Sequence, residues 1–274
     1  MTNFERVDLA GIAERLTAVP GIVGVTLGGS RARGDHVPDS DVDLGLYYRA
    51  PLDVAALGVA AREVAGPDAS VTASGAWGQW VDGGAWLTVD GVAVDWIYRD
   101  LDRVHRCWLD AQAGRYRWHF QVGHPLGFPD FAYAGEVALA AVLADPGGEV
   151  TRLRESAGAY PPALGDALVR GLAEAQFLLM VAAKAAGRAD SAYVAGCLFR
   201  IVGVCAHALH GRSARWLINE KGAVASAGRL SIAPAEFAER AQRLLAATGR
   251  TTAELSTTLD AARQLVTDTV LGCR

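Results

Sequence analysis

The stretch from Val25 to Tyr47, VTLGGSRARGDHVPDSDVDLGLY, decides how the chain begins to fold. It predicts a strand, a Gly-Gly-Ser turn, a basic loop and a second strand over residues 42–48. Side chains alternate between the two faces of a strand, so Asp41 and Asp43 share one face. The opposite face carries the apolar side chains of Val42, Leu44 and Leu46. Because that apolar face can enter a core, the two carboxylates are expected side by side on an open face.

The acids and the turn together predict a site for a metal ion and a triphosphate. Two neighbouring carboxylates repel each other, and burying them unpaired is costly. A divalent cation relieves that cost, and an oxygen-rich site that also meets phosphates suits Mg²⁺. In the turn Gly28-Gly29-Ser30, backbone N–H groups can approach an anion and the serine hydroxyl adds a donor. Taken alone, Asp-x-Asp is more typical of a solvated strand end.

These residues resemble the signature of the DNA polymerase β-type nucleotidyltransferases. Gly29-Ser30 is followed by Asp41-Val42-Asp43 in a hydrophobic strand. The runs 29–34 and 40–44 are most similar to the minimal and antibiotic-modifying (aminoglycoside or lincosamide) nucleotidyltransferases. The resemblance implies an α+β chain, with a small mixed-sheet nucleotidyltransferase domain followed by an all-α helical bundle.

A third acid is expected from a later strand. Segments 85–89 and 92–98 predict a hairpin that turns at Asp90-Gly91. Asp95 is the single acid of the second, otherwise apolar strand, and by itself it is as well explained as a partnered or exposed strand acid. In the resembling family a third carboxylate follows the Asp-x-Asp strand, and Asp95 fits that place.

The resemblance implies transfer of a nucleoside monophosphate from an NTP to a hydroxyl, with release of pyrophosphate. Asp41, Asp43 and Asp95 would be the catalytic residues and would hold two Mg²⁺ ions. Asp95 would also take the acceptor proton. ATP is the expected nucleotide by resemblance only. The expected nucleotide-binding residues are Gly28, Gly29, Ser30, Arg33 and Lys221.

Several of these residues have a plain structural alternative. Arg31 and Arg33 would place positive charge near the phosphates, or they are solvated surface arginines. Lys221, in the segment RWLINEKGA, points to the triphosphate in similar enzymes, but a solvated helix charge explains it equally well. Glu136 resembles the general base of some aminoglycoside enzymes, although a first-turn acid that favours the helix dipole is the stronger interpretation.

Other candidates are better explained by packing. Arg200 and His207 have the spacing found in HEPN ribonuclease domains, but Ile201, Val202 and Gly203 replace the polar residues that usually follow the arginine. A structural Arg–His pair is therefore favoured. The tryptophans Trp77, Trp80 and Trp86 would suit an acceptor pocket, but packing in the core is favoured for them.

The composition favours a soluble cytoplasmic protein without a long nucleic-acid partner. The chain has 274 residues, 51% of them hydrophobic, and a net charge of −4. It has no dense block of Lys and Arg, which argues against a long nucleic-acid partner. The cysteines Cys107, Cys197, Cys205 and Cys273 lack the Cys-x-x-Cys spacing of zinc sites and fit reduced thiols. No signal peptide or membrane-spanning run is expected.

We expect a nucleotidyltransferase catalytic domain over residues 1–125 and a helical domain over 126–274. Within the second, helices are predicted over segments that include 131–143, 163–186 and 215–225. Some relatives complete their sites across a dimer, so a homodimer is left open.

Three hypotheses about function follow. The leading one is a metal-dependent enzyme that nucleotidylates a small hydroxylated molecule, for example an antibiotic. The second keeps this chemistry but has tRNA or a protein side chain as the acceptor, as in nucleotidyltransferase toxins. The third, a non-catalytic nucleotide-binding protein, is the weakest, since all three expected acids are present.

Overall fold

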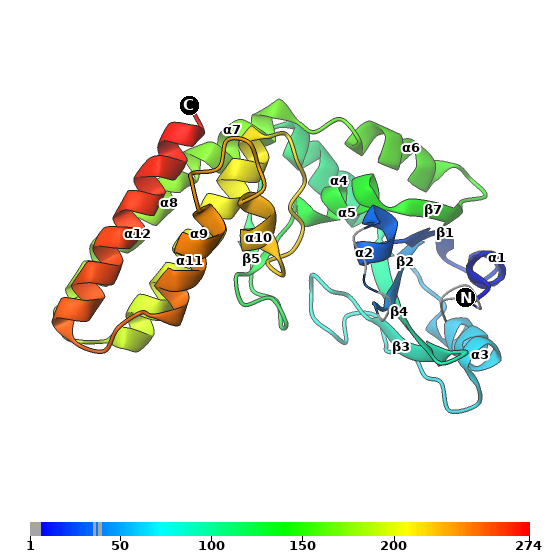
Figure 1. Cartoon of the computed structure of the whole chain (residues 1–274). Helices are drawn as coiled ribbons and strands as arrows, with labels where there is room; N and C mark the ends of the chain where they lie inside the picture. Colours follow the sequence, from blue (N-terminus) through cyan, green and yellow to red (C-terminus); the bar gives the residue numbers. More distant parts are fainter. Residues whose placement is uncertain (1–6, 35–36, 38–39) are drawn as a thin grey trace. The chain divides into compact units, whose positions relative to one another are not determined.

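The computed structural model describes residues 7–34, 37 and 40–274. The chain divides into two compact units (Figure 1). The first takes in residues up to 110 and residues 117–159, and the second takes in 111–116 and 160–274. The division thus lies later in the chain than the predicted boundary at residue 125. Residues 126–159 belong with the first unit because they supply a strand to its sheet.

A five-stranded mixed sheet forms the centre of the first unit. Its strands, in spatial order, are β3 (Gly84–Val89), β4 (Val92–Asp100), β2 (Val42–Tyr48), β1 (Ile22–Leu27) and β7 (Ala141–Ala144). The pair β2–β4 is parallel and the other pairs are antiparallel. This arrangement confirms the mixed sheet that the resemblance implies.

Strand β7 corrects the predicted helix over 131–143. Helix α5 (Ala132–Leu139) ends where Ala140 takes an extended conformation with ψ 156°. Residues from Ala141 onward pair with β1 instead. Alanine has the highest helix propensity, but propensity amounts to about 1 kcal/mol or less per residue, so pairing with a distant strand overrides it.

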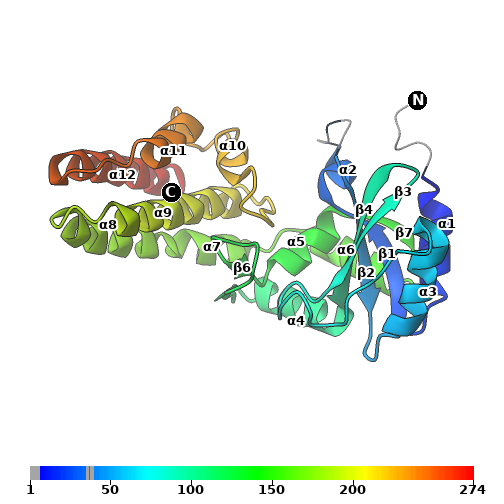
Figure 2. The same ribbon diagram turned by 90° about the horizontal axis from the view of Figure 1, so that it is seen from below.

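Helices α1 (Leu9–Thr17) and α3 (Val54–Ala65) cover one face of the sheet (Figure 2). Aspartates cap both, since Asp8 accepts a hydrogen bond from Gly11 N and Asp53 accepts one from Ala56 N, each at 2.9 Å. Their apolar faces pack on the apolar face of the strands, which includes Val25, Val42, Leu44, Leu46, Val94 and Trp96.

The remaining elements of the first unit are short. They are α2 (Gly29–Arg33), most of α4 (Leu101–Gln112), β5 (Trp118–His119), β6 (Phe128–Pro129), α5 and α6 (Glu149–Ala157). The two-residue strands β5 and β6 pair with each other, so the strand predicted over 116–122 is only partly formed.

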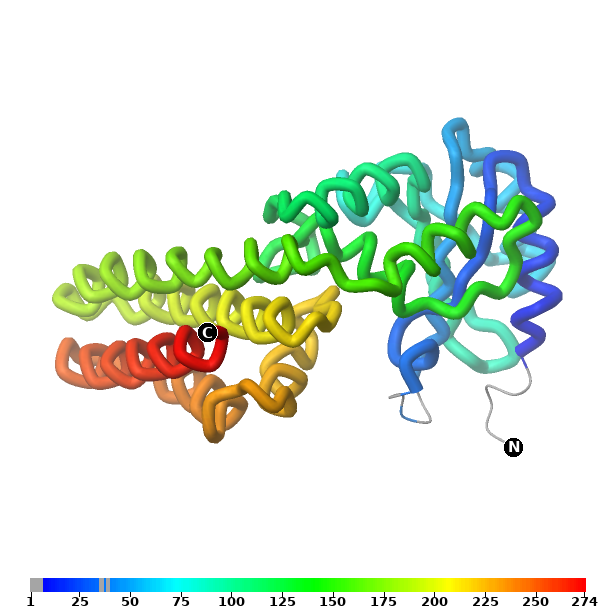
Figure 3. The backbone as a smooth tube through the Cα atoms, turned by 90° about the horizontal axis from the view of Figure 1, so that it is seen from above, coloured from blue at the N-terminus to red at the C-terminus, as the bar shows by residue number. Residues whose placement is uncertain are grey.

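The second unit is helical, as predicted. Its helices are α7 (Pro162–Arg170), α8 (Leu172–Ala186), α9 (Ser191–Arg212), α10 (Ala223–Ala227), α11 (Phe237–Ala246) and α12 (Thr252–Gly272). Helices α8, α9 and α12 run side by side around a shared apolar core (Figure 3). The helix predicted over 163–186 is two helices that meet at Gly171. The helix predicted over 215–225 is wrong for residues 215–222. Gly222 has a left-handed φ of 72°, and α10 begins only after it.

Helix α9 also corrects the expectation that no apolar run reaches membrane-spanning length. It has 22 residues and is long and apolar enough to cross a membrane. However, 67% of that apolar stretch is buried inside the protein, and the core helix of a soluble protein has the same composition.

Two glycines let α7 and α9 cross with their backbones in contact. A Cβ atom on Gly165 would lie 2.5 Å from the carbonyl oxygen of Gly211. That oxygen belongs to the backbone and cannot move aside as a flexible side chain would. A side chain at position 165 would therefore push the two helices apart.

We expect Gly165→Ala to lower the free energy of unfolding by about 1–3 kcal/mol, because the added methyl overlaps the α9 backbone. Gly196→Ala is the matched control, since no described atom lies within 4 Å of a Cβ there. That control should stabilise the protein by about 0.5–1 kcal/mol through helix propensity. Denaturant unfolding followed by circular dichroism measures both, and a stabilised Gly165→Ala variant would contradict the close crossing.

Candidate functional site

Strands β2 and β4 place two of the predicted acids directly opposite each other. In their parallel pairing Asp43 is the register partner of Asp95. The flanking Val42, Leu44 and Val94 are fully buried on the other face, whereas Asp43 and Asp95 are partly exposed. Asp41 is exposed and comes immediately before β2. The expected alternation of acidic and apolar side chains is therefore present.

The Gly-Gly-Ser turn packs against the carboxylate of Asp43. The N–H of Gly28 donates to the Asp43 carbonyl at 2.8 Å, which continues the β1–β2 pairing into the turn. Gly29 follows with a left-handed φ of 62°, and a Cβ atom on it would overlap Asp43 Oδ2. Helix α2 begins at Gly29, so Ser30 lies in its first turn. Only glycine allows the turn and the acid to approach so closely.

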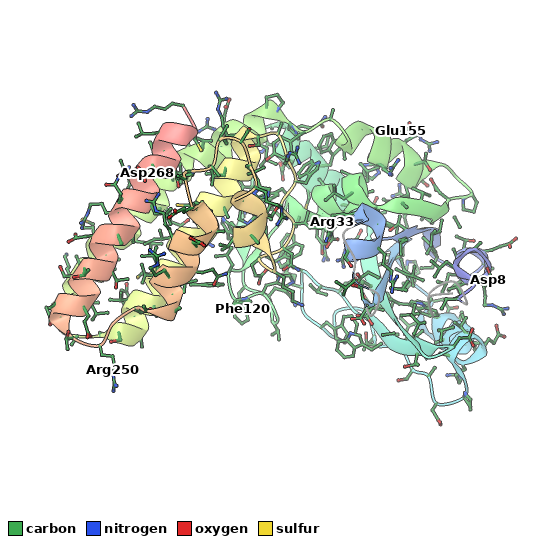
Figure 4. The ribbon with its side chains drawn as sticks, in the orientation of Figure 1. Asp8, Arg33, Phe120, Glu155, Arg250 and Asp268 are labelled. Carbon is green, nitrogen blue, oxygen red and sulfur yellow. The ribbon has the colours of Figure 1, made fainter. Side chains whose placement is uncertain are left out.

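The two arginines of α2 differ in what they contact. The Nε of Arg31 donates to the carbonyl oxygens of Ser40 at 3.0 Å and Asp41 at 3.2 Å. Arg31 therefore fixes the backbone that leads into β2, a positioning contact that sequence reasoning missed. Arg33 lies at the end of α2 and is exposed (Figure 4). Its predicted role in nucleotide binding stays a prediction.

The three acids interact electrostatically. Partial burial, together with the charges of Asp43 and then Asp41, raises the pKa of Asp95 to about 6. Such a set of oxygen donors, with repelling charges, fits a divalent cation. In the part of the chain that the structure describes, no three or more His, Cys, Asp or Glu side chains converge closely enough to enclose a metal. Binding would thus require these side chains to draw together.

Glu136 has a structural partner. Its two carboxylate oxygens accept hydrogen bonds from Nε and Nη2 of Arg99, at 2.6 and 2.9 Å. Arg99 is buried, so Glu136 neutralises a charge that would otherwise be costly. Glu136 also lies in the middle of α5, not in a first turn as expected. This ion pair disfavours Glu136 as a general base and leaves Asp95 as the candidate.

The candidates in the second unit fall into two groups. Arg200 donates to both carboxylate oxygens of Glu174, at 2.6 and 3.0 Å, and His207 is buried, which lowers the pKa of its ring. The structural interpretation of this pair therefore holds. Lys221 is exposed and lies in a turn before α10 rather than on a helix. Its contact with a triphosphate stays a prediction.

The tryptophans do not form one core group. Trp86 is 73% exposed, so core packing is wrong for this residue. Trp77 stacks on Trp86 with ring centroids 4.5 Å apart. Trp80 stacks instead on His119 at 3.7 Å, beneath the guanidinium of Arg103.

Residues 9–71 match the family model described as nucleotidyltransferase domain. The match takes in the glycine turn, Asp41 and Asp43, whereas Asp95 lies beyond it. Among solved structures, the chain is similar to a nucleotidyltransferase-like protein from Exiguobacterium sibiricum 255-15, at 12% identity and a TM-score of 0.48. That likeness covers 94% of this chain and 73% of the other. No curated protein matches the sequence.

The raised pKa of Asp95 predicts a pH-dependent stability. The folded protein holds this proton more tightly than the unfolded chain, so the stability of the metal-free wild type falls as pH rises from about 4 to about 6. Asp95→Asn should therefore be more stable than wild type at pH 7.5, by about 1 kcal/mol after allowing for partial exposure. The difference should shrink towards pH 4. Urea unfolding in EDTA measures it, with the exposed Asp68→Asn as control; an equal difference at both pH values would argue against it.

The packing of Gly29 on Asp43 predicts a local loss of nucleotide affinity in Gly29→Ala. The methyl group must displace the Asp43 carboxylate, so affinity for Mg²⁺-ATP should fall about tenfold or more. Gly34→Ala is the control, because Gly34 has a similar left-handed φ of 74° but no described atom within 4 Å of a Cβ. Calorimetric titration separates the two, and equal losses would mean that backbone strain, not the contact, is responsible.

Proposed function

We propose that this protein transfers a nucleoside monophosphate from an NTP to the hydroxyl group of a small molecule, and releases pyrophosphate. The observation that carries the proposal is the pairing of Asp43 with Asp95, beside a glycine turn that packs on Asp43. This geometry unites three segments that are separate in the sequence. The match to a nucleotidyltransferase domain supports the same reaction class.

The chain's residues take distinct roles in this proposal. Asp41, Asp43 and Asp95 would hold two Mg²⁺ ions, which neutralise phosphate charge and make the acceptor hydroxyl more acidic. The backbone N–H of Gly29 and the Ser30 hydroxyl would hold the terminal phosphates, whereas the predicted role of Gly28 is not supported, because its N–H already donates to the Asp43 carbonyl oxygen. Arg31 keeps the backbone of Asp41 in place.

The transfer forms one bond and breaks one. The acceptor oxygen attacks the α-phosphorus, the bond from that phosphorus to the bridging oxygen of pyrophosphate breaks, and pyrophosphate leaves opposite the incoming oxygen. Asp95 accepts the hydroxyl proton. Burial and the neighbouring carboxylates raise the pKa of Asp95 to about 6 in the metal-free protein, and a bound cation would lower it, so this carboxylate is ionised and able to accept a proton at neutral pH.

ATP is proposed as the nucleotide from the family resemblance alone. The composition supports a small acceptor, such as an antibiotic. The net charge is −4, which does not favour a long polyanion. The four cysteines are free thiols, which supports a reducing compartment such as the cytoplasm.

The test is transfer of labelled nucleotide to a panel of hydroxylated acceptors in the presence of Mg²⁺. Asp43→Asn keeps the size of the side chain but removes its charge, and it should lower turnover about 100-fold or more. Asp41→Asn should also reduce turnover, whereas the surface variant Asp68→Asn should match wild type. If Asp43→Asn consumes NTP as fast as wild type, this function is wrong.

A further inference from the structure

A stacked pair of tryptophans, of which Trp86 is exposed and Trp77 partly exposed, lies on the acid-bearing face of the sheet. The rings of Trp77 and Trp86 are 4.5 Å apart and nearly parallel, at 18°. Trp86 leaves 73% of its surface in contact with water. A large apolar ring in this position gains by covering its free surface with another ring.

Strand register places this pair beside the catalytic acids. Trp86 is the antiparallel partner of Asp95, and Asp95 is the parallel partner of Asp43. Residues directly opposite in neighbouring strands share a face, with Cβ atoms about 4.5–5.5 Å apart in an antiparallel pair. The order across this face is therefore the Gly28–Ser30 turn, Asp43, Asp95 and Trp86.

The loop that carries Trp77 is held by buried hydrogen bonds. The side chain of Gln121, which is 3% exposed, accepts from the N–H groups of Trp80 and Val81, at 3.0 and 3.2 Å, and donates to the Trp77 carbonyl at 2.7 Å. The hydroxyl of Tyr133 donates to the Trp80 carbonyl at 2.6 Å. These contacts pre-organise the loop and reduce the entropy lost when a ligand stacks there.

Gly84 on β3 lies close to both the neighbouring strand and the Trp77 ring. A Cβ atom on it would overlap the Trp96 carbonyl oxygen and would lie 3.0 Å from Trp77 Cη2. The β4 backbone is therefore the contact that requires glycine here. The Trp77 ring packs closely against the same point of β3, two residues before Trp86.

The direction of the reaction indicates what binds there. This step rests on the proposed function. In an in-line transfer the acceptor oxygen and the leaving pyrophosphate lie on opposite sides of the α-phosphorus. With the terminal phosphates at the Gly28–Ser30 turn, the acceptor approaches from the side of Asp95 and Trp86.

We propose that Trp77 and Trp86 form the acceptor subsite and select hydroxylated ring compounds. The flat face of the acceptor ring stacks on the exposed indole of Trp86, and a hydroxyl on the ring points to Asp95. An aromatic ring and the carbon-hydrogen face of a pyranose offer the same stacking chemistry.

The test compares ring-bearing with acyclic acceptors. Wild type, Trp86→Ala and Trp86→Phe are assayed for transfer from ATP to phenyl β-glucoside, methyl β-glucoside and glycerol. Trp86→Ala should raise the KM for the two glucosides about tenfold or more, a larger change than in the KM for ATP or for glycerol. Trp86→Phe should restore most of the loss. A larger effect on phenyl glucoside than on methyl glucoside would assign the stacking to the aromatic ring, and equal effects would assign it to the sugar.

Phe120→Ala is the control variant, because Phe120 is also an aromatic residue of the first unit and is 91% exposed. The proposal is overturned if Trp86→Ala and Phe120→Ala change the glucoside KM equally. It is also overturned if Trp86→Ala raises the KM for ATP alone, since Trp86 would then bind the nucleotide base.

Binding of phenyl β-glucoside to the nucleotide-free protein separates this inference from the proposed function. Saturation-transfer NMR should show binding to wild type and Phe120→Ala, and a loss in Trp86→Ala. If no variant transfers nucleotide but this loss is seen, the reaction is wrong and the ring subsite stands. Equal binding to wild type and Trp86→Ala would remove the subsite, whatever the catalytic result.

Discussion

The repulsion between Asp43 and Asp95 is the constraint on which the first unit depends. Parallel pairing of β2 and β4 holds these carboxylates opposite each other, and it does so because the alternate residues are fully buried. A shift of β2 by one residue would bury Asp43 and expose Val42 and Leu44. The apolar core beneath α1 and α3 therefore fixes the register that brings the acids together. A fold that offsets this repulsion with its core can hold a charge arrangement that attracts cations.

Glycines shape the same face of the sheet. Gly29 admits the Asp43 carboxylate, and a Cβ atom on Gly45 would lie 2.8 Å from Thr26 Oγ1. A Cβ atom on Gly84 would overlap the Trp96 carbonyl oxygen of β4 and also crowd the Trp77 ring. Glycines contribute no side-chain packing, so the apolar side chains on the opposite face of the sheet have to supply the stabilising contacts. Strands with several glycines therefore still form a stable sheet, because the apolar side chains of the other face are packed in a core.

Local chemistry determined what could be predicted from the sequence. The alternation in β2, the Asp53 cap of α3 and the Asp90-Gly91 turn are signals within a few residues, and the structure contains all three. The turn also places Trp86 opposite Asp95, because Val89 pairs with Val92 and each earlier residue of β3 then pairs with the next residue of β4. That inference was available from the sequence, but the apolar character of tryptophan favoured the core instead. Strand β7 was not accessible in this way, since its pairing with β1 joins residues far apart in the chain.

For the same reason, the type of reaction can be predicted from the sequence more readily than the acceptor. The turn and the first two acids come from one contiguous stretch, so a motif can reveal the type of chemistry. The stacked tryptophans depend on a loop that Gln121 holds from 44 residues away from Trp77. Gln121 contacts the loop backbone at Trp77, Trp80 and Val81, so changes at its position alter the tryptophan pair through that backbone. Acceptor choice can therefore diverge while the β2–β4 register, and with it the chemistry, stays fixed. The physical reason is that the whole apolar face of the sheet stabilises the β2–β4 register, whereas the Trp77–Trp86 pair depends on a few hydrogen bonds from Gln121 and Tyr133.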